Sequence, residues 1–272
     1  MTSLPALGRN LRRPPGPRPA PAGGTLVLYR PGSSAVHRLP AQVKIVCALL
    51  AVVCVVATPR TQFWAFGAYL VLLAAVWAAA AVPVGHVARR AVIEVPFVVV
   101  ALVMPFLGGG ERFRFLGMSL SEQGALAGWN ILAKGTLGVL VSLTLAATTT
   151  PRELVVGLQR LHAPAVLTTI ATLMLRYLEV IAAEARRMRT ARISRGHDPR
   201  FLWQVGATAR GIGALFVRSY ERGERVHLAM VSRGWTGRMP DGGTTAGAGA
   251  WLAGLTPVVL AATVLAAAVL LR

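Results

Sequence analysis

Residues 63–82 read FWAFGAYLVLLAAVWAAAAV, a run of twenty residues without a charged side chain. At the 1.5 Å rise of an α-helix, about twenty apolar residues span the hydrocarbon core of a bilayer. Trp64, near the start of the run, lies where aromatic side chains favour the membrane interface. The run therefore predicts a transmembrane helix.

Four further apolar runs lie on either side of this segment. Lys44, just before the first of them, is expected to extend its ammonium group to the interface. The composition agrees with a membrane protein, because 54% of the residues are hydrophobic and only 14% are charged, against about a quarter in soluble domains. We expect an all-α integral membrane protein with about five transmembrane helices and long cytoplasmic helices. The predicted spans are residues 45–58, 63–82, 91–107, 124–147 and 250–271, the first four within residues 36–147 and the last within 243–272.

The charge is strongly basic, with 29 Lys and Arg against 10 Asp and Glu and a net charge of +19. Nucleic-acid binding is not favoured, because the basic residues lie between apolar runs, as in the cytoplasmic loops of membrane proteins. Residues 1–35 form a basic, Pro-rich tail that is expected to be disordered. Up to Lys44 the chain has seven basic and no acidic residues, which predicts a cytoplasmic N-terminus in the cell membrane and an external Arg272.

Residues 148–242 differ from the spans, since 15 arginines fall between positions 151 and 240. Four spans from an inside N-terminus bring this region back to the cytoplasm, where the charge bias also places it. The pattern predicts a short amphipathic helix from Pro151, a second helix from Pro164 and a third from near Leu202. Arg176 and Glu179 interrupt the apolar stripe of the second helix, so we expect it to remain cytoplasmic.

Two segments of this region repeat at an offset of 38 residues: ARISRGHDPR at 191–200 and AMVSRGWTGR at 229–238. Each is expected to close a helix, because glycine suits the left-handed position past a helix end and a cation suits the last turn. One copy would be an ordinary helix stop. Two copies with matching flanks favour docking to a partner, since a planar guanidinium can form paired bonds to a carboxylate. The predicted docking residues are Ser194, Arg195, Gly196, Ser232, Arg233 and Gly234.

Glu94 and Lys134 are ionisable residues inside apolar runs. Such a charge costs about 2.5–3.5 kcal/mol at the bilayer centre, so it usually pairs or marks a functional site. We favour a structural pair between these two side chains within the bundle over a role in substrate binding.

Other chemistry is weakly represented. None of the five histidines is followed by a second ligand-type residue at i+3 or i+4, and no G-x-x-x-x-G-K-[ST] loop occurs, so we expect no metal site, no cofactor and no ATP binding by this chain. Cys47 and Cys54, two turns apart on one helix, are too distant for a disulfide. Gly206, Gly211 and Gly213 are expected to allow close helix packing.

Residues 36–272 resemble the transmembrane T component of energy-coupling factor transporters, in the cobalt-type EcfT/CbiQ group. The resemblance rests on residues 37–44, 94–97, 104–107 and, most specifically, on RSYERGERV at 218–226 leading into AMVSRG at 229–234. It implies two long coupling helices whose arginine-bearing ends dock into two ATPase subunits. Those arginines would be Arg195 and Arg233. The residue before each arginine is often Ala in the family and is Ser in this chain.

The resemblance also implies a separate substrate-binding membrane subunit, the S component, and uptake of a cobalt or nickel ion or of a vitamin. Two other classes of membrane protein are less favoured. A membrane-embedded enzyme would need clustered acidic or histidine residues at the interface, and a stand-alone permease would need polar residues through several spans. Only Glu94 and Lys134 are of that kind, so the sequence favours a non-catalytic coupling subunit.

Overall fold

The computed structural model describes residues 29, 32, 34–81, 94–109, 112–115, 118–196, 206–239 and 246–271, of which side chains are described except at 112–120 and 207. It confirms the predicted helical membrane fold, to which a two-stranded hairpin is added. The elements in chain order are α1 (Ala35–Arg38), α2 (Ala41–Ala57), α3 (Phe63–Ala80), α5 (Val95–Leu107), β1 (Arg112–Phe115), β2 (Met118–Ser121), α6 (Glu122–Thr148), α7 (Pro151–Arg160), α8 (Ala165–Ser194), α9 (Gly206–Val231) and α10 (Ala248–Leu270).

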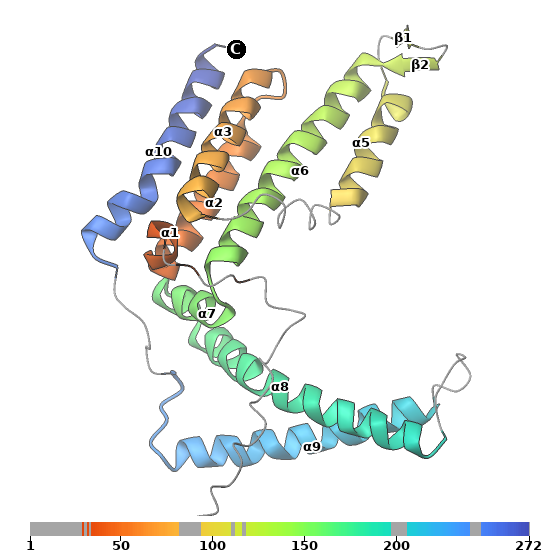
Figure 1. Ribbon diagram of the computed structural model, residues 1–272, viewed down its shortest axis with the longest axis vertical. Helices are drawn as coiled ribbons and strands as arrows, with labels where there is room; N and C mark the ends of the chain where they lie inside the picture. The colour runs from red at the N-terminus through yellow and green to blue at the C-terminus, as the bar shows by residue number, and fades with distance from the viewer. Residues whose placement is uncertain are drawn as a thin grey trace, which may run out of the picture.

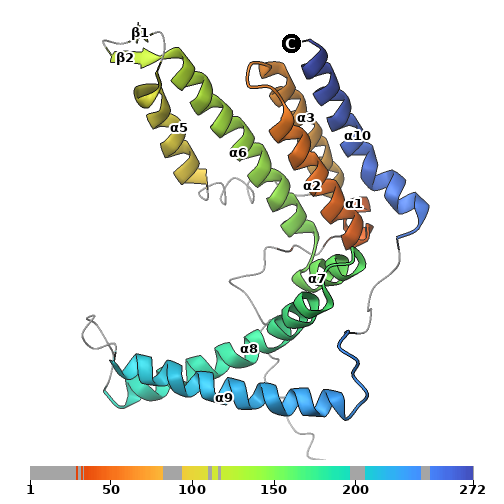
Figure 2. The same cartoon turned by 180° about the vertical axis from the view of Figure 1, so that it is seen from behind.

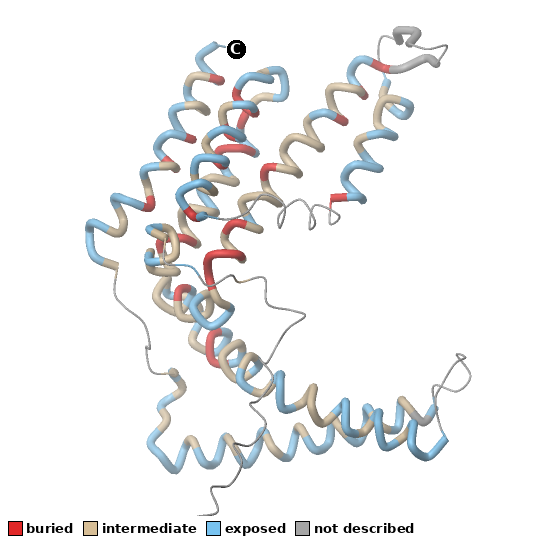
Figure 3. Tube along the Cα trace, in the orientation of Figure 1, coloured by how far each residue is buried: buried red, intermediate tan, exposed pale blue. Residues whose placement is uncertain are grey.

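Helices α2, α3, α6 and α10 form a bundle, and α5 packs along α6 (Figures 1 and 2). Buried Phe66, Tyr69 and Leu137 belong to the core cluster between these helices. The outer faces are also apolar: Val71 is 69% exposed and Leu252 72% exposed. Figure 3 shows exposed residues along the outside of every helix of the bundle. An apolar surface of this kind is stable in hydrocarbon and not in water.

By length and composition, four described helices could cross a membrane, namely α3, α6, α8 and α10. Helices α2 and α5 are apolar but have only 17 and 13 residues. Helix α2 still lies within the bundle beside α10 and α6. Helix α8, which we expect in the cytoplasm, runs away from the bundle below α7 in both views (Figures 1 and 2).

Two glycines allow α5 and α6 to approach closely. A Cβ added at Gly128 would lie 2.4 Å from the backbone oxygen of Ala101, and one at Gly124 would lie 2.4 Å from that of Met104. Any larger residue at either position would push the helices apart. The antiparallel hairpin β1–β2 connects them, at the end of the bundle away from α7 (Figure 1).

The other end of the bundle is joined around Lys44. This residue is buried rather than extended to an interface as expected, with 7% exposure. Its Nζ donates to the backbone oxygens of His37, at 3.1 Å, and Thr148, at 2.9 Å. Both acceptors lie in the last turn of a helix, α1 and α6 respectively, where carbonyl groups lack helical partners. Lys44 thus connects the start of α2 to the ends of two other helices.

Below the bundle, α7 turns the chain into α8. Thr150 and Glu153 form a capping box that starts α7. At its end, His162 has a left-handed φ of 62°, His162 N–H donates to Gln159 O, and Ala163 N–H donates to Leu158 O. These two bonds define a Schellman motif, and Pro164 follows it as the N-cap of α8. The corner between α7 and α8 is therefore set by backbone geometry.

Candidate functional site: two exposed helix ends

The two Ser-Arg-Gly triplets end α8 and α9 with the same backbone geometry. Gly196 has a φ of 76° and Gly234 a φ of 80°, so both adopt the left-handed conformation that the sequence predicts. Gly196 N–H donates to Ile193 O at 2.9 Å, and Gly234 N–H donates to Val231 O at 2.9 Å. These are equivalent bonds of the Schellman motif, and they present the residue before each glycine in the same way.

The flanking bonds extend this likeness. Ser194 Oγ donates to Thr190 O at 3.0 Å, and Ser232 Oγ donates to Ala229 O at 3.1 Å. Each hydroxyl is thus used by its own helix. The second Schellman bond is present after α9, where Trp235 N–H donates to Met230 O at 3.0 Å. The matching position after α8, residue 197, lies outside the described residues, as does the rest of the first repeat to 200.

Arg195 and Arg233 are exposed, and neither side chain forms a hydrogen bond or ion pair with any residue that the structure describes. Three other arginines of helices α8 and α9 bond to side chains of the neighbouring helix. Arg192 donates to Thr208 Oγ1, and Arg218 and Arg222 each lie 3.2 Å from a carboxylate oxygen of Glu184. The exposed Arg186, Arg187, Arg189 and Arg210 also form no bond with a described residue, so Arg195 and Arg233 are distinguished by their place at the two equivalent helix ends, where their donors are available to a partner.

The contacts between α8 and α9 determine where these ends lie. Arg192, near the end of α8, reaches the first turn of α9, and Glu184, two turns earlier in α8, meets Arg218 and Arg222 further along α9. The helices therefore run in opposite directions, as Figures 1 and 2 show. The triplet of α8 lies beside the start of α9, and the triplet of α9 lies at its far end. With 26 residues, α9 is about 39 Å long.

The possible pair between Glu94 and Lys134 is not formed. Lys134 Nζ instead donates to the backbone oxygen of Val56, at 2.7 Å. Glu94 is buried, with 9% exposure, and its Oε1 has no partner among the described residues. The sequence could indicate that each charge needs a partner, but not that Lys134 would find a backbone carbonyl on α2.

The glycines of α9 also differ from expectation. Only Gly211 is near α8, where an added Cβ would lie 3.8 Å from Met188 Cε, and added Cβ atoms at Gly206 and Gly213 meet nothing within 4 Å. Ion pairs and a hydrogen bond, rather than close backbone contact, hold α8 and α9 together. Glu184, which forms the main polar contact between α8 and α9, could not be recognised from the sequence, because its partners lie 34 and 38 residues away.

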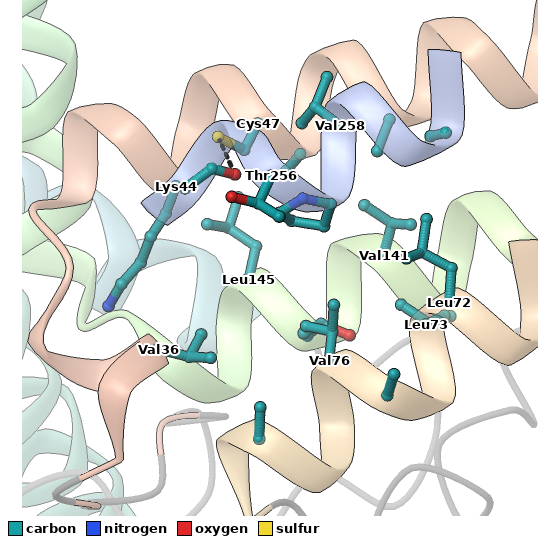
Figure 4. Close-up of a pocket in the computed structure, with 18 of the residues that line it drawn as sticks. Val36, Lys44, Cys47, Leu72, Leu73, Val76, Val141, Leu145, Thr256 and Val258 are labelled. Carbon is teal, nitrogen blue, oxygen red and sulfur yellow. Dashed lines mark hydrogen bonds between the residues drawn. The ribbon is translucent and has the colours of Figure 1, made fainter. Parts of the chain in front are cut away.

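A cavity of about 530 Å³ lies inside the bundle between α2, α3, α6 and α10 (Figure 4). Its walls are almost entirely aliphatic, including Leu73, Val141 and Val258. Cys47 Sγ donates to Gly254 O at 3.0 Å, as drawn in Figure 4. Across the described parts of the chain, no group of three His, Cys, Asp or Glu residues could hold a metal ion.

Comparisons with known proteins agree with these features. The family model described as "Cobalt transport protein", CbiQ, matches residues 32–242. The cobalt transport protein CbiQ of Rhodobacter capsulatus is 33% identical over 209 residues, which cover 75% of this chain and 83% of that protein. The energy-coupling factor transporter transmembrane protein EcfT of Bacillus selenitireducens is 28% identical over 227 residues, covering 77% and 82%. The protein of the same name from Acidaminococcus fermentans is 27% identical over 230 residues, covering 78% and 84%.

Proposed function

The chain belongs to the CbiQ family, the transmembrane T components of energy-coupling factor transporters, and from this membership we propose a coupling role for its two exposed helix ends. In this role the chain links ATP hydrolysis by two partner ATPase subunits to uptake through a separate substrate-binding membrane subunit. The chain itself performs no catalysis. It transmits motion of the ATPase subunits, which contact its two helix ends, to the subunits in the membrane.

One observation carries the proposal: two helix ends of equal geometry each present an exposed arginine at opposite ends of α9. Two equivalent ends suit a partner with two equivalent grooves. A guanidinium at such an end can reach a carboxylate or a pair of backbone carbonyls beyond the helix, since its five donors are otherwise unused. The distance between the ends, about 39 Å along α9, leaves room for one ATPase subunit at each.

The membrane orientation is part of the proposal. The α8–α9 pair would lie in the cytoplasm, together with the N-terminus, and the C-terminus would lie outside. The structure supports this arrangement, because Gln62 Nε2 donates to Leu271 O at one end of the bundle, whereas Lys44 and Thr148 meet at the other. Figure 1 places α7, α8 and α9 beyond that second end.

We further propose a cobalt or nickel ion as the substrate, with a vitamin as the alternative. The name of the Rhodobacter capsulatus relative favours cobalt. The substrate would be bound by the separate S component, and this chain would never contact it directly. Co-purification in mild detergent, followed by identification of the small membrane partner, would distinguish a metal-ion transporter from a vitamin transporter.

The test is removal of the two arginines. Arg195→Ala or Arg233→Ala alone should weaken co-purification of the ATPase subunits and reduce uptake, and the double change should abolish both. Losing one buried, charge-assisted contact costs about 2–5 kcal/mol at an interface. Arg→Lys should restore little, because an ammonium cannot make a planar two-point contact.

Arg225→Ala is the matched control. Arg225 is also exposed on α9, and its ion pair with Glu221 is long, at 4.0 Å. It should leave assembly unchanged, and all variants should insert in the membrane at the parental level. If the double alanine variant assembled and transported like the parent, the two triplets would be ordinary helix ends and the proposed coupling role would fail.

A further inference from the structure

We propose that Gln159 closes α7, α8, α9 and residues 232–239 into a single frame, and that this frame moves as one body against the bundle through α7. The proposal deepens the coupling role and rests on it for its transport readout. Gln159 is a positioning residue, because it contacts neither of the predicted docking ends. The frame is defined by residues 151–196 and 206–239.

The closing contact joins segments far apart in the chain. Gln159 Nε2, on the last turn of α7, donates to Met239 O at 2.8 Å, across 80 residues. Met239 lies five residues after Gly234, so the bond brings the chain that follows the α9 end back to α7. In Figures 1 and 2 the chain runs out along α8, returns along α9 and then turns up toward α7.

The other sides of the frame have their own ties. The Schellman motif at His162 and the following Pro164 set the corner between α7 and α8. Glu184 joins α8 to α9 through two arginines, and Arg192 joins them again through Thr208. Each corner or side that the structure describes is therefore held by a named contact, so a force at either docking end acts on the whole frame.

The frame meets the bundle mainly at one place. Among the described elements, α9 packs on α8, α8 packs on α7 and α9, and α7 packs on α2 and α8. The α7–α2 contact is centred on Gly157, where an added Cβ would lie 3.0 Å from Gln42 N and 3.1 Å from Ala41 C. The nearest atom to that Cβ is Ile45 Cδ1, at 2.9 Å, and the next two belong to the backbone of α2, which packs closely enough to transmit displacement. A rigid element pivoting at a packed contact is a common form of domain motion.

The alternative is an open arrangement, in which α8 and α9 swing separately and the bond from Gln159 is incidental. The two arrangements differ in what loss of this bond does. In a closed frame, removing the donor of Gln159 releases residues 232–239 from α7. Motion of the end of α9 then no longer moves α7. In an open arrangement, the same change has no effect on α9.

The first experiment needs no partner and therefore tests the frame alone. Spin labels at exposed Arg152 of α7 and Leu228 of α9, in the full chain carrying Cys47→Ser and Cys54→Ala in nanodiscs, report their distance by pulsed electron resonance. The parent should give one narrow distribution. Gln159→Leu and Gln159→Asn, which remove or shorten the donor, should both broaden it. Gln123→Leu, at an exposed position of α6, is the matched control and should not.

The second experiment uses the assembled transporter. Gln159→Leu should lower uptake by about tenfold, equivalent to about 1.4 kcal/mol, while ATP hydrolysis stays near the parental rate. Cysteines at 159 and 239, in the same cysteine-free background, lack the bond from Gln159 and should show the same low uptake as Gln159→Leu. Joining them with a short bis-maleimide should raise uptake toward the parental level, because the link closes the frame again.

The proposal is overturned if Gln159→Leu leaves the distance distribution as narrow as in the parent, or if the cross-link does not raise uptake. Failure of the coupling role is recognised separately, because the spin-label result does not depend on ATPase subunits. A narrow parental distribution that only Gln159 variants broaden would support the frame even if the Arg195 and Arg233 variants still assembled.

Discussion

In the bundle, buried side chains such as Phe66, Tyr69 and Leu137 meet across α3 and α6, whereas none of the described side chains of α9 is buried. Helix α8 has only Thr168 and Thr169 buried, both close to α7. Figure 3 shows the same contrast, with buried positions along the bundle and exposed ones along α8 and α9. The bundle is thus held by side-chain packing, and the α8–α9 pair by a few ion pairs and hydrogen bonds.

This difference indicates how each region responds to change. Packed interiors lose stability when volume is added or removed, because neighbouring atoms cannot rearrange freely. Exposed ion pairs add only about 0.2–1 kcal/mol each, so the contacts between α8 and α9 contribute little to the stability of the whole chain. The bundle is suited to remain constant, and the α8–α9 pair is suited to change position when partners bind.

The largest effect should come from overpacking the bundle. Gly128→Ala places a Cβ 2.4 Å from the backbone oxygen of Ala101, so α5 must move away from α6, at a cost of about 1–3 kcal/mol. The melting temperature of the detergent-purified chain, followed by size-exclusion chromatography, should fall. Gly138→Ala on the same helix meets nothing within 4 Å and should not lower it. Equal melting temperatures would mean that α5 is held loosely.

A similar or slightly smaller loss should follow Lys44→Met. The change removes the bond to the part-buried carbonyl of His37 and takes the Lys44 donor from the buried carbonyl of Thr148, which costs about 1–3 kcal/mol in the folded state. Lys134→Met removes a single bond, to Val56 O, and should cost less. Thermal unfolding of both variants ranks them. The opposite order would show that the joint below the bundle contributes little to its stability.

A local effect is expected at the docking ends. Gly234→Ala forces a Cβ into a left-handed residue with φ 80°, at a cost of about 1–2 kcal/mol. Hydrogen exchange at residues 228–235 should accelerate and ATPase co-purification should weaken, with the melting temperature of the bundle unchanged. Gly223→Ala, in the exposed middle of α9, is the control and should slow exchange, because alanine favours the helix. Unchanged exchange in Gly234→Ala would contradict a specific role for this conformation.

The smallest effect on stability should come from Glu184→Gln. Its two arginine partners are 61% and 34% exposed, so the loss should stay below about 1 kcal/mol. Uptake should nevertheless fall, since the crossing of α8 and α9 becomes less defined. Glu221→Gln, which loses only the 4.0 Å contact with Arg225, should leave uptake unchanged. A large drop in melting temperature for Glu184→Gln would erase the distinction between the two regions.

Some features follow from the chain alone. A run such as residues 63–82 predicts a membrane helix because length and polarity are properties of a single segment. The left-handed glycines at 196 and 234 were predictable for the same reason, since a helix end depends on its own few residues. The starts of α7 and α8 at Pro151 and Pro164 were also predicted closely, whereas Leu202, near which the third helix was expected to begin, lies outside the described residues.

Other features depend on contacts between distant segments. The partners of Lys44, Lys134 and Glu184 lie on other helices, and no local pattern specifies which carbonyl or carboxylate will be near. The opposite placement of the two arginine ends and the bond from Gln159 to Met239 O arise only when α9 folds back along α8. A charged residue in an apolar segment predicts that some polar partner is needed, because an unpaired buried charge is costly. Which group becomes that partner depends on how the whole chain packs.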